Sequence, residues 1–262
     1  MRPAKSLKSR ALVAVLLSPA VGACLASGCA LAAERAPHAG VQVAWVNAKM
    51  IKQRDADRAL RETLAHAADA ATARLGRPAA FSADPARHLA LPEALKAMRG
   101  NWNAVGRSGA LTALEAAMNS AAEAAAPSCR PFLQDAIVDI DFSDAVAIVR
   151  SGDEAASRFF AVRVRAALEV QIRPNIEAAL TRAGAFEALD RAAVAGGAPQ
   201  RAAAYRDRVI DATVAGELDA VFAEMRAEER DIRADPTGRG SPLLRDVFSS
   251  YGGVSPMANA GG

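Results

Sequence analysis

The sequence has few of the residues from which disulfides and metal sites are built. It contains three cysteines and three histidines in 262 residues. Cys24 and Cys29 lie in an apolar N-terminal stretch, so only Cys129 remains if that stretch is removed. A single cysteine cannot form an intramolecular disulfide and provides no Cys–His spacing for a metal. We therefore expect a fold held by packing alone, with no metal site and no cofactor.

The chain also lacks the strong catalytic and nucleotide-binding signatures HExxH, GxSxG, CxxC, Walker A and GxGxxG. The net charge of the chain is +3, and this excess of basic residues comes from the N-terminus. Residues 1–33 hold four basic side chains and no acidic ones. Without them, 28 basic and 29 acidic side chains leave a net charge of −1. This balance gives no support for nucleic-acid binding, so we expect no nucleic-acid partner.

Residues 1–33 have the order of a signal peptide. They are basic as far as Arg10, then apolar, and end in small residues before Ala33. We predict cleavage near Ala33 and a periplasmic mature protein. Cys24 and Cys29 each follow small residues, as in bacterial lipoprotein boxes, so lipidation at either cysteine is the alternative. Membrane attachment is expected only through such a lipid anchor.

The rest of the chain is rich in alanine, and its apolar residues recur at helical spacing without a sustained strand pattern or internal repeat. We predict an all-α fold: a single bundle of about eight to ten helices with proline and glycine breaks. The expected organisation is a linker over residues 34–55, a helical domain over 56–248 and a flexible tail over 249–262. Because alanine buries little area, the core should be thin, with closely approaching helices.

Prolines place the expected breaks near the centre of the chain. A helix is not expected to run through Pro127 and Pro131, and another should end before Pro174. The helix that starts after Gly152 has two alternative N-caps: Asp153, or Ser151 in a capping box with Glu154.

A row of polar residues accompanies the apolar stripe of the helix that precedes these prolines. Four-residue spacing places Glu115, Asn119 and Glu123 side by side. We expect Asn119 and Glu123 to face the helix that begins at Asp153, or the segment Glu228–Arg233, rather than water, with Arg158 and Arg233 as the partners of Glu123. The candidate polar cluster comprises Glu115, Asn119, Glu123, Asp153, Arg158, Glu228, Glu229 and Arg233.

Two interpretations of this cluster are open. Helix caps and ion pairs would favour a non-catalytic helical binding or interaction module, whose partner is an envelope protein, a lipid or a cell-wall ligand. A shared polar pocket would favour a periplasmic hydrolase or cation-binding protein that uses clustered carboxylates. We favour the module over the enzyme. A deep pocket lined by several of these acids would reverse that preference.

Several motifs resemble one bacterial family. The run MNSAAE over residues 118–123 resembles the MNxAAE signature of the family catalogued as domain of unknown function 4197. The similarity extends over residues 56–248 and includes Leu89–Pro92, Gly152–Ala156 with Phe159 and Phe160, Glu228–Pro236, and Leu243–Phe248. Arg163 and Val164 depart from the Lys-Thr pair that members usually carry. The resemblance implies an exported, mostly helical bacterial protein and implies no reaction.

Overall fold

The computed structural model describes residues 51–95 and 109–249, and 80% of the structure is helical. No strand occurs in these two ranges, so the all-α class predicted from the sequence is confirmed. The predicted signal peptide with Cys24 and Cys29, most of the predicted linker and the tail from residue 250 lie outside the described residues.

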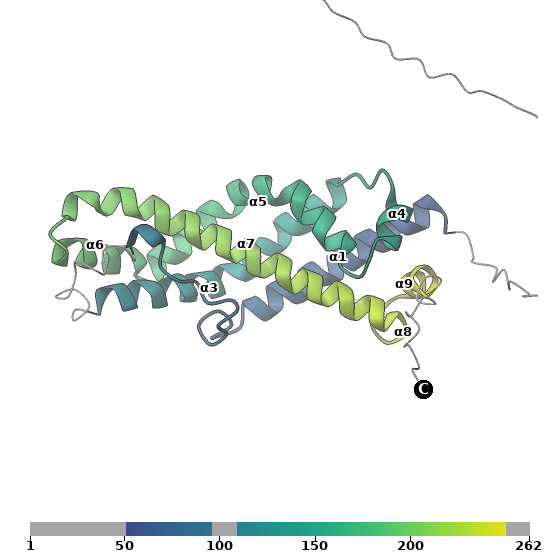
Figure 1. Ribbon diagram of the computed structural model, residues 1–262, viewed down its shortest axis with the longest axis horizontal. Coiled ribbons are helices and arrows are strands. Elements are labelled where there is room, and N and C mark those ends of the chain that lie inside the picture. The colour runs from purple at the N-terminus through teal and green to yellow at the C-terminus, as the bar shows by residue number, and fades with distance from the viewer. Residues whose placement is uncertain (1–50, 96–108, 250–262) are drawn as a thin grey trace, which may run out of the picture. The chain divides into compact units, whose positions relative to one another are not determined.

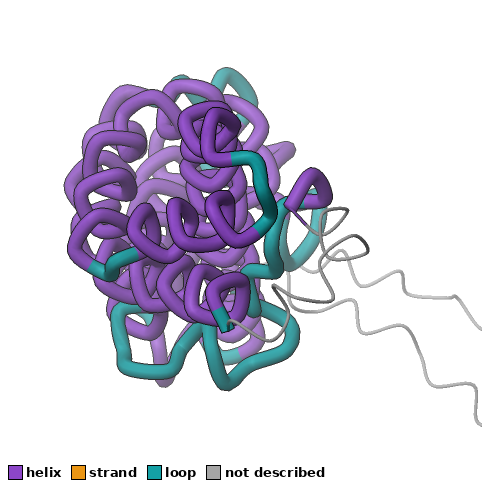
Figure 2. Tube along the Cα trace, turned by 90° about the vertical axis from the view of Figure 1, so that its left-hand side faces the viewer, coloured by secondary structure: helices purple, strands orange, loops and turns teal. Residues whose placement is uncertain are grey.

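Four long helices form the centre of the bundle (Figure 1). They are α1 (Gln53–Leu75), α3 (Ala110–Asp139), α5 (Ala155–Arg182) and α7 (Ala202–Ala234). Helix α1 packs against α3, α3 against α5, α5 against α7, and α7 back against α1. The four helices therefore enclose a common core, and the end-on view in Figure 2 shows the described helices packed around one another.

Shorter elements close the bundle at its ends. Helix α4 (Ala145–Arg150) packs against α1, and α6 (Ala185–Ala195) packs against α3. The 3-10 turn η1 (Pro199–Arg201) leads into α7. Helix α8 (Pro236–Arg239) follows α7, and α9 (Pro242–Phe248) returns to pack against α1. None of the described helices is both long and apolar enough to cross a membrane.

Alanine fills much of the interior, as the composition predicts. On α1, Ala59 and Ala67 are fully buried. A methyl group keeps neighbouring backbones close, so the helices approach one another tightly. Phe81, Phe160 and Phe222 are the largest fully buried side chains, and the rings of Phe160 and Phe222 meet edge to face with centroids 6.3 Å apart. The bundle therefore combines close helix contacts with a few aromatic fillers.

The helix breaks predicted at Pro127, Pro131 and Pro174 are wrong. Helix α3 continues through the first two prolines, and α5 continues through the third. All three prolines are exposed, so none of them takes a core position of its helix. Each helix also buries residues on both sides of its proline. This packing outweighs the cost of about 3 kcal/mol for a proline inside a helix.

Two glycines let the segment 76–92, which follows α1, lie close to the long helices. A side chain at Gly76 would place its Cβ 2.7 Å from Cγ of Pro127 on α3. A side chain at Gly216 on α7 would place its Cβ 2.3 Å from Cδ2 of Leu89. Both distances are shorter than carbon contacts allow, so a side chain at Gly76 would meet the rigid ring of Pro127, and one at Gly216 would displace the tip of the Leu89 side chain.

Candidate functional site

Asn119 binds Leu89 in the segment 76–92, so the prediction that it faces the helix from Asp153 or the segment Glu228–Arg233 is wrong. Its side chain is fully buried. The amide Oδ1 accepts a hydrogen bond from the Leu89 N–H at 2.9 Å, and Nδ2 donates to the Leu89 carbonyl at 2.9 Å. Nδ2 also donates to the carbonyl oxygen of Glu115 at 2.8 Å. The amide therefore uses both of its donor hydrogens and holds Leu89 in place through two reciprocal bonds.

Glu123 binds the same segment one helical turn later. Its Oε2 accepts from the Ala79 N–H at 3.0 Å. Its Oε1 accepts from the N–H groups of Phe81 at 3.1 Å and Ser82 at 3.2 Å, and from the Ser82 hydroxyl at 3.2 Å. Four donors thus converge on one carboxylate, which orders a turn that has few helical hydrogen bonds of its own.

The partners predicted for Glu123, Arg158 and Arg233, are wrong, because neither contacts it. Backbone N–H groups of the segment 76–92 bind the Glu123 carboxylate instead, so this carboxylate has donors without an arginine. Glu115 completes the row, since its Oε1 lies 2.7 Å from Nε2 of His88 in the same segment. Glu115, Asn119 and Glu123 of α3 therefore all anchor the segment 76–92.

We expect Glu123→Gln to lower the free energy of unfolding by about 1–3 kcal/mol, because the amide loses the charge that strengthens these bonds and places an NH2 group among donors. Urea denaturation measures the loss, and hydrogen exchange at Ala79, Phe81 and Ser82 should accelerate. Glu177→Gln, at an exposed position on α5, is the control and should change stability little. Equal stability of the two variants would contradict the anchoring role.

Glu229 and Arg233, which are both on α7, form a buried pair beside the start of α5. Glu229 is fully buried, and its carboxylate accepts from the N–H groups of Ala156 at 3.0 Å and Ser157 at 2.7 Å. Arg233 Nε donates to Glu229 Oε1 at 2.9 Å; Nη2 lies 2.8 Å from that oxygen but is not oriented for a hydrogen bond. Arg233 Nη1 donates to the Val149 carbonyl of α4 at 2.9 Å. The pair therefore joins α7 to both α4 and α5.

The cap of α5 differs from both alternatives that the sequence left open. Helix α5 begins after Glu154, and no local side chain caps it. Neither Asp153 nor the box of Ser151 with Glu154 takes that role. The carboxylate of Glu229 on α7 binds the first N–H groups instead, where the helix dipole favours a negative charge.

Glu228 belongs to a separate network between α1 and α7. It pairs with Arg74 of α1, and its Oε1 lies 3.6 Å from Nη1 of Arg239. Arg74 also contacts Glu224 at 3.3 Å, and Arg87 contacts Glu224 at 2.7 Å. These pairs connect α1 and the segment 76–92 to α7, and they account for Glu228 as a structural residue.

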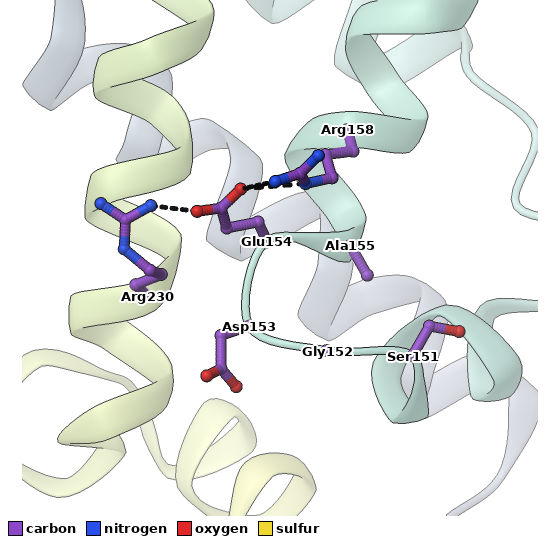
Figure 3. A pocket seen from close by; sticks show the side chains of 7 residues that line it. All are labelled: Ser151, Gly152, Asp153, Glu154, Ala155, Arg158 and Arg230. Carbon is purple, nitrogen blue, oxygen red and sulfur yellow. Dashed lines mark hydrogen bonds and ion pairs between the residues drawn. The ribbon is translucent and has the colours of Figure 1, made fainter.

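Asp153 and Arg158 line an open depression of about 460 Å³ at the turn between α4 and α5 (Figure 3). Glu154 accepts hydrogen bonds from Arg158, at 2.9 Å, and from Arg230. Burial opposes its ionisation, but the hydrogen bonds from Arg230 and Arg158 outweigh it and hold the pKa of Glu154 below its ordinary value. Figure 3 shows the Asp153 carboxylate pointing away from these pairs. The arginines are largely exposed, so the pairs contribute little stability.

The structure thus divides the predicted polar cluster among four places: the anchors of segment 76–92, the buried pair, the network between α1 and α7, and the open depression. Within the described residues, no group of three or more His, Cys, Asp and Glu side chains is placed to hold a metal ion. Among the described residues, the depression beside Asp153 is open rather than deep, and Asp153 is the one acid of the predicted cluster that lines it.

A second depression, which sequence reasoning missed, lies between the C-terminal part of α3 and the middle of α5. We call it the α3–α5 groove; its volume is about 390 Å³. Its apolar lining comprises Phe132, Ala136, Ile140, Val164, Ala167 and Leu168, and its polar lining comprises Asp135, Asp139, Asp141, Arg163 and Gln171. The sequence contains a pattern that could have indicated this groove, since aspartates alternate with apolar residues along the end of α3.

A buried carboxyl group was also missed. Glu217 on α7 is fully buried, its Oε1 lies 4.0 Å from Sγ of Cys129, and its Oε2 has no hydrogen-bond partner. Burial raises the pKa of Glu217 to about 8, and burial followed by the charge of Glu217 raises the pKa of the Cys129 thiol. Glu217 lies between Val214 and Val221 on the apolar stripe of α7, so helical periodicity could have revealed its burial.

Comparison with known proteins gives one match. A family model described as protein of unknown function (DUF4197) matches residues 50–249. Neither the curated proteins nor the solved structures contain a significant match.

Proposed function

Because the chain belongs to the DUF4197 family, for which no function is described, we propose from its own structure that it is an exported envelope protein acting as a non-catalytic helical binding module. The α3–α5 groove is its binding face, and its partner is another protein of the envelope. The signal-peptide pattern of residues 1–33 supports export.

The proposal rests on the difference between the predicted polar cluster and the α3–α5 groove. Most of the predicted polar residues are committed to internal contacts: Asn119 and Glu123 bind backbone groups, and Glu229 binds Arg233. The α3–α5 groove instead places exposed carboxylates next to an apolar surface. A concave apolar surface with polar groups at its edge is typical of a binding site, whereas internally satisfied pairs are typical of structural contacts.

Photocrosslinking in cells tests the binding face. We expect a photoreactive residue at Ala167, which lines the groove, to crosslink to an envelope protein that mass spectrometry identifies. The same residue at Ala178 is the matched control, because Ala178 is exposed on α5 but does not line the groove. Crosslinking only to lipid or cell wall, or no difference between the two positions, would overturn the assignment of a protein partner at this face.

Export has its own test. We expect mass spectrometry of the protein recovered from cells that express the full chain to find an N-terminus near Ala33, or a lipidated Cys24 or Cys29. Either form places the protein outside the cytoplasm, and the mass of the acyl groups distinguishes them. Recovery of the chain with Met1 intact would contradict export.

A further inference from the structure

The three aspartates of the α3–α5 groove have no partner within the part of the chain that the structure describes. Asp135, Asp139 and Asp141 are exposed, and none of the three side-chain carboxylates forms a hydrogen bond or ion pair with a described residue. Asp135 and Asp139 are four residues apart on α3, where like charges repel each other. Both lie in the last turns of the helix, whose dipole also disfavours negative charge there. No ion pair with a described residue therefore relieves this repulsion.

The nearby arginines are engaged elsewhere. Arg61 of α1 pairs with Asp57 and donates to the carbonyl oxygens of Ile137, Val138 and Ile140 at the end of α3. It therefore satisfies the backbone but pairs with none of the three aspartates.

Arg163 lies over the ring of Phe159, with its Cζ 4.7 Å from the ring centroid. Arg163 is the one cationic residue in the lining of the groove. Three acidic groups and one basic group leave the groove with a net charge of −2.

The apolar lining of the groove lies directly beside these aspartates. In this lining Phe132, Ala136 and Val164 are half-buried and Ala167 is exposed, so part of it is open to a partner. An acidic rim beside apolar surface complements an element that carries basic and apolar residues on one side.

The geometry points to an amphipathic cationic helix of a partner protein as the occupant of the α3–α5 groove. This inference rests on the proposed binding function and names the chemistry of its partner. A helix fits because two neighbouring helices present a channel into which the side chains of a third can pack. Basic residues at the edges of that helix pair with the aspartates, while its apolar face covers Ala167 and Leu168. An anionic lipid surface is disfavoured, because the groove would repel it.

Peptide binding tests the inference directly. The probe is a fluorescent peptide of about 18 residues in which leucine and lysine alternate with helical period. A second peptide carries glutamate in place of every lysine. With protein purified from cells expressing the full chain, we expect fluorescence anisotropy to show that the lysine peptide binds at least about tenfold more tightly than the glutamate peptide, and that salt weakens its binding.

Variants of the groove locate the binding. The combined change Asp135→Asn, Asp139→Asn and Asp141→Asn should weaken binding of the lysine peptide by about tenfold or more. The control neutralises three exposed carboxylates outside the groove, Glu177, Asp207 and Asp219, and alters net charge by the same amount. Ala167→Arg should also weaken binding, whereas Ala178→Arg should not. Circular dichroism checks that each variant remains folded.

The outcomes separate the inference from the proposed function. Equal weakening by the groove and control neutralisations would overturn the inference, since only net charge would then matter. Equal affinity for the two peptides would overturn it as well, and a protein crosslink at Ala167 would then leave the binding module standing. A monomer–dimer equilibrium that Ala167→Arg abolishes, without peptide binding, would identify a second copy of the chain as the occupant and overturn the cationic partner.

Discussion

Replacing Glu229 with glutamine is expected to lower the free energy of unfolding by about 3–5 kcal/mol, the usual cost of leaving one member of a buried ion pair alone. Arg233 would keep its charge with a side chain that is only 7% exposed. The N–H groups of Ala156 and Ser157 would also lose a charged acceptor. Urea denaturation monitored by circular dichroism measures the loss.

Two further variants show whether the buried charge causes this loss. In Glu229→Gln combined with Arg233→Met, the unpaired charge is gone, so the combined loss should be smaller than the sum of the two single losses. Asp219→Asn removes one partner of an exposed pair with Arg165 and should cost less than about 1 kcal/mol. Additive losses in the double variant would contradict a coupled buried pair.

The size of the Glu229 effect follows from its position. Its carboxylate binds the start of α5, and its partner Arg233 binds the end of α4. Arg233 also lies over the ring of Phe248 in α9, with its Cζ 4.5 Å from the ring centroid. A single buried pair thus connects four helices at one end of the bundle, and its loss would loosen all of them.

The stability of the protein is expected to fall as pH rises from about 4.5 to about 8, through the ionisation of Glu217. The ordinary pKa of 4.5 describes the unfolded chain, and burial raises the pKa to about 8 in the fold. Between these values the folded protein binds more protons than the unfolded chain, so raising the pH favours unfolding. At 1.36 kcal/mol per pKa unit, the expected loss is about 3 kcal/mol at pH 7 relative to pH 4.

Glu217→Gln should remove this part of the pH dependence of stability, because the amide does not titrate. The free energy of unfolding of the variant should therefore depend less steeply on pH between about 5 and 8 than that of the unmodified protein. Asp219→Asn on the same helix is the control, since Asp219 is exposed. Parallel pH profiles for the Glu217 variant and the unmodified protein would show that Glu217 does not titrate in this range.

Local patterns in the sequence were enough for the features that depend on neighbouring residues. Helix α1 ends at Leu75, directly before Gly76, and glycine directly after the last apolar position is a local signal for the end of a helix. Helix α9 begins after Ser241, whose hydroxyl accepts from the Leu244 N–H. The all-α class follows from the same periodicity. The proline breaks failed because they are also local rules, and the packing of α3 and α5 on both sides of each proline overrides them.

The sequence by itself determined the class of the fold, the stripes that face the core and the polar residues that need partners. Only the tertiary structure decided which partners they have: Glu123 binds backbone N–H groups of the segment 76–92, and Glu229 caps a helix that begins far earlier in the chain. It also decided that Glu217 is buried opposite Cys129. Residues separated by many positions meet only when the helices are placed against one another, so no local pattern specifies which of several carboxylates will reach a given donor.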